Sequence, residues 1–166
     1  MILTTNLAFL AAQLMSRAMK SWKAYYDTVL FVTCMNLLYN LLCKNYLVWQ
    51  YHPDLLLNHK TTDLLNSFVL LPAATMLYLH FFPSTKWNKF VYYLGWIALF
   101  AVIELIWVTY GRITYQYGWT FVWSIVFYFC MFYVIAIHSA HRIWALLISL
   151  LFICLLLIKF KVPLGE

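Results

Sequence analysis

Long apolar segments alternate with short polar ones along the chain. Five of them come close to the about 20 mainly apolar residues that a membrane-spanning helix needs, at residues 25–43, 64–82, 90–110, 119–137 and 143–160. A shorter sixth segment covers residues 2–18, and we expect it to span as well, because interfacial helices carry more charge on one face. Lipid cannot satisfy exposed backbone groups, so every span is predicted to be helical. The pattern therefore predicts an all-α polytopic helical bundle of five to six spans with short loops, in a single transmembrane domain over residues 1–166.

The composition excludes a soluble globule. Hydrophobic residues make up 66% of the chain and charged residues 10%, against roughly 45–50% and about 25% in soluble domains. The eleven Lys and Arg residues outnumber the five Asp and Glu residues, but they lie singly or in small groups between apolar blocks. That distribution is typical of loops near lipid headgroups. We therefore expect membrane lipids, and no nucleic acid, as partners.

Alternating spans place the polar loops on two sides of the membrane. Side A holds Arg17–Lys23, Lys86–Lys89 and His141–Arg142, and side B holds residues 44–63, the loop around Arg112 and the residues after 158. Side A carries six basic residues and side B carries five. By the positive-inside rule, this excess and the two lysines beside the span at residues 25–43 predict that side A is cytoplasmic.

Glu104 is the one charged residue that lies well inside an apolar segment. Ionisable groups are costly in lipid and are therefore candidates for function. Glu104 lies six residues before Tyr110 at the side-B end of its span, which places it about 9 Å deep. Other polar residues fall at a similar depth on neighbouring spans or just outside it, namely Asn36, Asn40, Asn66, Ser124 and Asp63. Together they predict a polar chamber that opens toward side B, with Arg112 as a counter-ion at its mouth.

Two interpretations of this polar set stay open at this point. In the first, Glu104 and the asparagines bind or conduct a small ligand, an ion or a proton. In the second, the polar groups hold the helices together, since interhelical hydrogen bonds are common in membranes at about 0.6 kcal/mol each. The Glu104→Gln substitution separates the two, because only the first interpretation requires an ionisable group.

Several local features have simpler expectations. Asp27 and Asp63 lie at predicted helix starts and are expected to act as caps, as is Thr61 or Thr62. Pro72 lies in the middle of a span and is expected to bend it. Four aromatic residues at span ends are expected to be interface anchors, namely Trp87, Tyr115, Tyr117 and Trp119.

Sequence motifs for metals, cofactors and nucleophiles are lacking. The chain has no P-loop, no dinucleotide fingerprint and no G-x-S-x-G elbow, so we expect no cofactor. His80, His138 and His141 lie near side A and form the one candidate metal set, because residues at i and i+3 share a helix face. We expect interfacial histidines there and no metal.

The order of motifs resembles a family. A Y-x-P turn ends at Pro53, a polar helix start holds Asp63, and Pro72 and Glu104 follow within apolar segments. An I-x-Y-x-x-G-W box then covers residues 113–119, with Tyr115, Gly118 and Trp119 at its fixed positions. This order resembles a family of small multi-spanning membrane proteins from Bacillus- and Clostridium-type spore-forming bacteria. The resemblance covers roughly residues 20 to 140 and implies a bacterial cytoplasmic (inner) membrane, but it implies no activity. The family's basic residue after the turn is Asp54 here.

Three classes of function compete on this sequence. The first is an integral membrane protein that binds or conducts a small ligand or ion around Glu104, acting as a homo-oligomer. The second is an accessory subunit of a larger membrane protein. The third is a membrane enzyme that acts on a lipid or isoprenoid, which the missing catalytic motifs make the least favoured.

Overall fold

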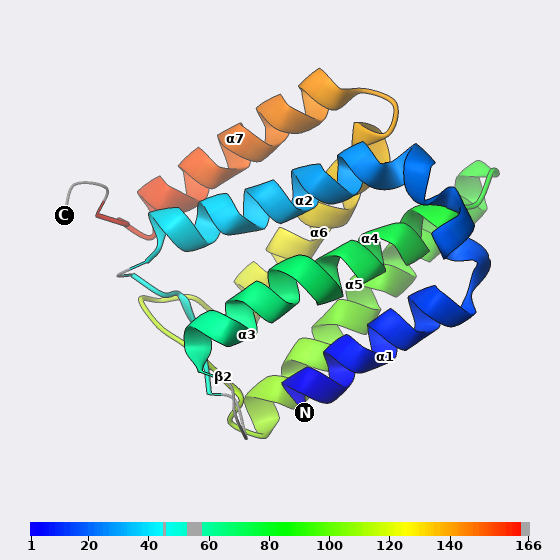
Figure 1. The fold of residues 1–166 in the computed structure, drawn as a ribbon. Helices are drawn as coiled ribbons and strands as arrows, with labels where there is room; N and C mark the ends of the chain where they lie inside the picture. Colours follow the sequence, from blue (N-terminus) through cyan, green and yellow to red (C-terminus); the bar gives the residue numbers. More distant parts are fainter. Residues whose placement is uncertain (45, 53–57, 164–166) are drawn as a thin grey trace.

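The computed structural model describes residues 1–44, 46–52 and 58–163, so Pro53 and Asp54 lie outside the described residues. The helices are α1 (Ile2–Met15), α2 (Trp22–Leu42), α3 (His59–Leu65), α4 (Leu71–His80), α5 (Lys86–Thr109), α6 (Phe121–His138) and α7 (Arg142–Lys159). A 3-10 turn η1 (Arg17–Ser21) precedes α2, and a π-helical segment η2 (Asn66–Leu70) joins α3 to α4. The fold is the all-α helical bundle that the apolar pattern predicts (Figure 1).

Four helical rods among the described residues are long and apolar enough to cross a membrane, namely His59–His80, Lys86–Thr109, Phe121–His138 and Arg142–Lys159. The protein is therefore embedded in a membrane. Helix α2 has 21 residues but is more polar than these four. Helix α1 has 14 residues and ends at Met15, because Ser16 adopts an extended backbone and its hydroxyl accepts a hydrogen bond from Ala18 N. The predicted span over residues 2–18 is therefore wrong in its end point.

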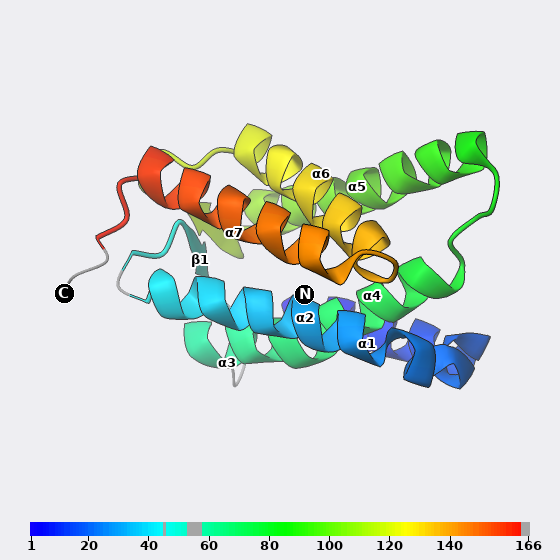
Figure 2. The ribbon, with the colours of Figure 1, turned by 90° about the horizontal axis from the view of Figure 1, so that it is seen from above.

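The helices form two layers. Figure 2 shows α1, α2 and the α3–α4 rod in one layer, and α5, α6 and α7 in the other. Within each layer neighbouring helices pack closely, α4 against α1 and α2, and α6 against α5 and α7, whereas contacts between the layers are few. The interface between the layers is consequently where internal space remains.

Aromatic side chains fill the side-A half of that interface. Tyr78 and Phe132 are fully buried there, and their ring centroids lie 5.1 Å apart. Phe100 packs edge-on against Phe132 at 5.1 Å and lies 5.6 Å from the ring of Tyr128. Each of these rings contributes to one continuous buried cluster. These rings thus hold α4, α5 and α6 together in the side-A half.

Pro72 produces a π-helical segment. Proline has no N–H to donate and its ring clashes with the carbonyl of the preceding turn. The turn just before it widens, so that the amide of Leu71 donates to the carbonyl of Asn66. A π-turn inserted into an α-helix is frequently found at functional sites. In this protein it begins at Asn66, one of the predicted chamber residues.

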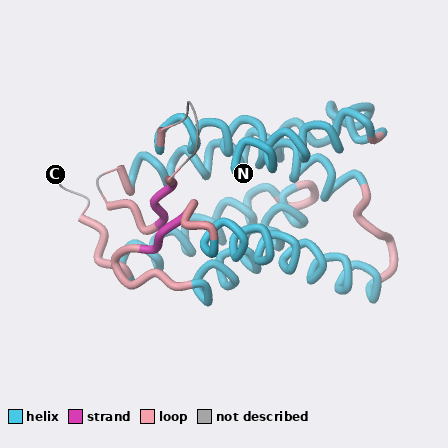
Figure 3. The backbone as a smooth tube through the Cα atoms, turned by 90° about the horizontal axis from the view of Figure 1, so that it is seen from below, coloured by secondary structure: helices cyan, strands magenta, loops and turns pink. Residues whose placement is uncertain are grey.

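A two-stranded ribbon crosses the side-B end of the bundle and was not predicted from the sequence. Strand β1 (Trp49–Tyr51) pairs antiparallel with β2 (Ile113–Tyr115), with Trp49 opposite Tyr115 and Tyr51 opposite Ile113. Figure 3 shows the two strands at one end of the helices. The segment expected to be only a polar loop therefore carries ordered backbone that covers the predicted chamber.

Two capping predictions are wrong. Helix α3 begins one turn before Asp63, and Asn58 caps it by accepting a hydrogen bond from Thr61 N at 2.9 Å, while the Thr61 hydroxyl accepts from Asn58 N at 2.8 Å. Helix α2 begins at Trp22, so Asp27 lies in its second turn. There it forms an exposed ion pair with Arg142. Apolar periodicity located both helices but missed their first turns, which are polar.

Candidate functional site

A cavity of about 80 Å³ lies between the two layers in the side-B half. Its walls come from α2, the α3–η2–α4 rod, α5, α6 and strand β1. Five of the residues predicted for the chamber line it, namely Asn36, Asn40, Asp63, Asn66 and Glu104. The structure therefore brings together polar groups that come from three different helical rods and are up to 68 positions apart in the sequence.

Glu104 is the most enclosed charged group of the cavity, with 2% of its surface exposed. Its Oε1 atom accepts hydrogen bonds from the Ser124 hydroxyl at 2.5 Å and from the Tyr115 hydroxyl at 2.7 Å. Its Oε2 atom accepts a hydrogen bond from the Tyr128 hydroxyl. An ionised carboxylate offers about four lone-pair sites, and three are taken here. The remaining acceptor capacity belongs to a side chain that lines the cavity.

The donors to Glu104 are themselves held in place. The indole Nε1 of Trp119 donates to Ser124 Oγ at 2.9 Å, and Ser124 is fully buried. Gly118 has a φ of +82°, a conformation that favours glycine, and this turn directs Trp119 back toward α6 after β2. Burial and the hydrogen bond to Glu104 raise the pKa of the Tyr115 hydroxyl. Tyr115 therefore keeps its proton and remains a donor.

Tyr115 and Trp119 were expected to anchor the chain at the membrane interface, and that expectation is wrong. Trp119 is 5% exposed, and both residues point toward the Glu104 network. By contrast, Trp87 is 72% exposed and Tyr117 is 48% exposed, as anchors should be. Position in the sequence could not separate the two pairs, because all four residues lie near span ends.

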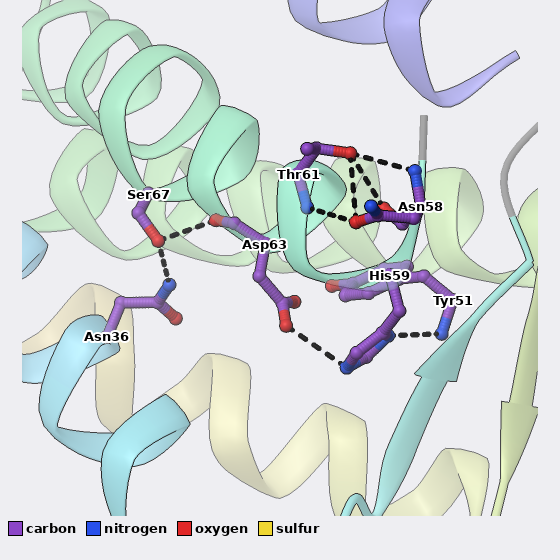
Figure 4. A network of polar contacts seen from close by, with 7 residues as sticks. All are labelled: Asn36, Tyr51, Asn58, His59, Thr61, Asp63 and Ser67. Carbon is purple, nitrogen blue, oxygen red and sulfur yellow. Dashed lines mark hydrogen bonds and ion pairs between the residues drawn. The ribbon is translucent and has the colours of Figure 1, made fainter. Parts of the chain in front are cut away.

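Asp63 provides a second carboxylate from the opposite layer. Its Oδ2 atom lies 3.1 Å from His59 Nε2, and His59 Nδ1 accepts a hydrogen bond from the backbone N–H of Tyr51 at 3.1 Å (Figure 4). One imidazole thus joins the carboxylate to strand β1. Asp63 is neither a helix cap nor fully solvated, since 17% of its side chain is exposed.

The three asparagines have different surroundings. Asn36 donates to Ser67 Oγ at 2.7 Å, and that hydroxyl donates to the Asp63 carbonyl at 2.6 Å (Figure 4). Asn66 accepts from Asn6 Nδ2 at 2.9 Å, which ties α1 to the π-helical segment. Asn40 lines the cavity without a hydrogen bond to any described residue. Asn36 and Asn66 therefore join helices, as the structural interpretation requires, while Asn40 is available to an occupant.

Two predicted residues lie outside the cavity wall. Ser124 contacts the site only through its hydrogen bond to Glu104. Arg112 lies in the turn before β2, where its backbone N–H donates to Trp107 O at 2.7 Å and its carbonyl accepts from His52 N at 2.9 Å. Arg112 is not among the described residues that line the cavity. Its predicted place at the chamber mouth stays a prediction.

The three histidines of side A do not converge. His80 Nδ1 is hydrogen-bonded to Ser21 at 3.0 Å, and His138 Nδ1 is hydrogen-bonded to Thr28 at 2.9 Å. His141 is exposed at the start of α7. No group of three His, Cys, Asp or Glu side chains within the described residues is arranged to hold a metal.

Sequence reasoning missed the aromatic part of the site. Trp49 and Tyr51 of β1, Trp107 of α5 and Tyr128 of α6 all line the cavity. The helical spacing of Ser124 and Tyr128 was a usable signal, because residues four apart share one face and both donate to Glu104. The only signal for β1 in the sequence was the presence of aromatic residues in its segment, Trp49 and Tyr51.

Comparisons of this chain with protein-family models, curated proteins and solved structures found no match. The resemblance to the bacterial family stays a prediction. The function must therefore be inferred from the geometry of the cavity.

Proposed function

We propose that this protein is an intramembrane binding protein whose cavity holds a small cationic or hydrogen-bond-donating group beside Glu104 and Asp63. The observation that carries this proposal is the charge of the cavity wall. Two carboxylates line it, and none of its described lining residues is Lys or Arg. Buried carboxylates are normally paired, and the hydroxyls around Glu104 satisfy it only in part. A cation or a donor group in the cavity would complete its pairing.

The arrangement favours binding over conduction. A conducting path must continue to side A, but Tyr78, Phe100, Tyr128 and Phe132 pack ring against ring on that side of the cavity. Aromatic rings at these separations leave no room for a hydrated ion. The proposal is therefore a binding site whose side-A end is closed by aromatic rings.

The membrane and its orientation are further parts of the proposal. We infer a bacterial cytoplasmic membrane with side A in the cytoplasm, on the basis of the family resemblance and the positive-inside rule. A homo-oligomer or a larger membrane partner remains compatible with the exposed apolar helix faces. The accessory-subunit alternative has no specific observation in its favour.

Binding is tested with methylammonium as the probe. The protein in lipid nanodiscs is titrated with methylammonium chloride while tryptophan fluorescence is recorded, since Trp49 and Trp107 line the cavity. We expect saturable binding that Glu104→Gln weakens at least tenfold, with sodium acetate at equal ionic strength giving no signal.

The control is Asp27→Asn, which removes an exposed carboxylate outside the cavity and should leave the affinity unchanged. The same folded content by circular dichroism in both variants shows that any loss is local. Equal methylammonium affinity in Glu104→Gln and in the unsubstituted protein would overturn the proposal and leave Glu104 with a structural role.

A further inference from the structure

A second, almost wholly apolar cavity of about 120 Å³ adjoins the first. Helices α2, α6 and α7 contribute most of its wall, and α4 contributes Leu71. The only described polar side chains in its wall, apart from tyrosine, tryptophan and cysteine, are Asn36 and Ser149. We call this space the α2–α7 groove, because α2 and α7 line it from the two different layers of the bundle (Figure 2).

Helix α7 lines this groove along one face, which is apolar apart from Ser149. Its lining residues recur at helical spacing, at Ser149, Phe152, Ile153, Leu156 and Leu157, so they share one face. All five are half-buried, and Ala145 is the only buried residue of α7. A helix in a membrane normally associates through close packing. Here the face that points at the bundle leaves space for another apolar chain.

The groove and the polar cavity adjoin each other. Both are lined by the same five residues, namely Asn36, Tyr39, Leu71, Phe127 and Met131. On α2 the groove extends from Phe31 to Leu42, a distance of about 16 Å along the helix. Taken together, the two adjoining spaces form a combined space with a long apolar arm between helices and a short polar arm that ends at Glu104 and Asp63.

We propose that the occupant of the combined space is an amphiphile with a long apolar tail and an uncharged or cationic headgroup that donates hydrogen bonds, such as a long-chain amine or alcohol. This inference rests on the proposed function and specifies its ligand class. The tail occupies the α2–α7 groove, and the headgroup passes Asn36 to reach the carboxylates. Two carboxylates in the polar arm exclude a fatty acid or another anionic head by repulsion.

The shape of the space also defines the route of entry. The groove lies between α2 and α7, and the outer face of α7 is exposed along the helix, with Leu151 63% and Ile158 76% exposed. In a membrane these side chains contact lipid. An amphiphile therefore enters sideways from the bilayer between α2 and α7, without passing through water.

Dodecylammonium and methylammonium are compared as probes in nanodiscs, with dodecylammonium expressed as its mole fraction in the lipid and sodium dodecanoate as the anionic control. We expect dodecylammonium to bind at least tenfold more tightly than methylammonium, dodecanol to compete with it, and dodecanoate not to compete. Ile153→Trp fills the groove and should remove the tail-length advantage while leaving methylammonium affinity unchanged.

The matched control is Ile158→Trp, the same substitution on the exposed face of the same helix. It should leave the affinity for both probes as in the unsubstituted protein. If methylammonium binds but dodecylammonium gains nothing, or if Ile153→Trp behaves like Ile158→Trp, the amphiphile inference is wrong and the proposed cation site stands. If neither amine binds, both fail.

A second copy of the chain is the competing occupant of the groove. In that case native mass spectrometry shows a dimer that Ile153→Trp dissociates and Ile158→Trp does not. Such a result would overturn the amphiphile assignment. A monomer with bound dodecylammonium would support the assignment, provided that the Ile153→Trp variant is a monomer without bound dodecylammonium.

Discussion

The hydroxyl of Tyr115 in strand β2 donates a hydrogen bond to the Glu104 carboxylate in helix α5 at 2.7 Å. Eleven residues separate the two in the sequence, across the end of α5 and the turn that precedes the strand. The bond couples the ribbon at the side-B end of the bundle to Glu104, the one buried carboxylate among the described residues. Any movement of the ribbon therefore alters the surroundings of Glu104.

Tyr115→Phe should destabilise the protein by about 1.5–3 kcal/mol, because a hydrogen bond to a charged group is worth about that much. The ribbon should also become more accessible to protease. The measurement is unfolding in mixed micelles together with limited proteolysis. Tyr117→Phe is the control, since Tyr117 is 48% exposed and its hydroxyl has no hydrogen bond to a described residue. Equal stability of the two variants would show that the Tyr115 contact contributes nothing.

Asn6→Ala should detach helix α1 from the rest of the bundle. Asn6 is fully buried and donates to Asn66 at 2.9 Å, and removing a buried partner costs about 1–3 kcal/mol. We expect faster cleavage within residues 2–15 and a lower unfolding midpoint. Thr4→Ala, on an exposed part of the same helix, is the control and should behave like the unsubstituted protein. Unchanged cleavage in Asn6→Ala would contradict this assignment.

Arg142→Ala should have little effect on stability, although it breaks the ion pair with Asp27. The two side chains are 68% and 53% exposed, and exposed ion pairs are worth about 0–1 kcal/mol. Thr28→Val, at the position after Asp27 in α2, should lower the free energy of unfolding by more. This substitution removes the buried hydrogen bond between Thr28 and His138. Unfolding of both variants in parallel tests this order. A larger loss of unfolding free energy in Arg142→Ala than in Thr28→Val would contradict this prediction.

Single cysteines should reveal which loops share a side. In a background where the four native cysteines are replaced by serine, Lys20→Cys and Lys89→Cys should react alike with an impermeant maleimide. Lys44→Cys and Tyr117→Cys should react alike with each other and oppositely to the first pair. With side A in the cytoplasm, intact cells label only the second pair. Labelling of only the first pair would reverse the proposed orientation, and a mixed pattern would contradict the fold.

The sequence alone determined that this protein lies in a membrane, that its apolar segments are helices, and which polar residues share one depth. These properties follow from each residue's own cost of transfer into lipid, and such costs are read off position by position. The same reasoning singled out Glu104 and four other residues that line the cavity. It erred at helix starts, such as those near Asp27 and Asp63, because polar first turns carry little apolar signal.

Only the tertiary structure decided what surrounds those residues. Depth along a helix leaves its rotation and its neighbours undetermined, and nearly every face of these helices is apolar. The hydroxyls of Tyr115 and Tyr128 reach Glu104 because β1 pairs with β2 and α6 packs against α5, and both contacts join residues distant in sequence. The α2–α7 groove likewise exists because α2 and α7 belong to different layers, which make few contacts with each other. Such relations between separate segments are absent from any local pattern, so the sequence identified the carboxylate and the packing of the chain formed its site.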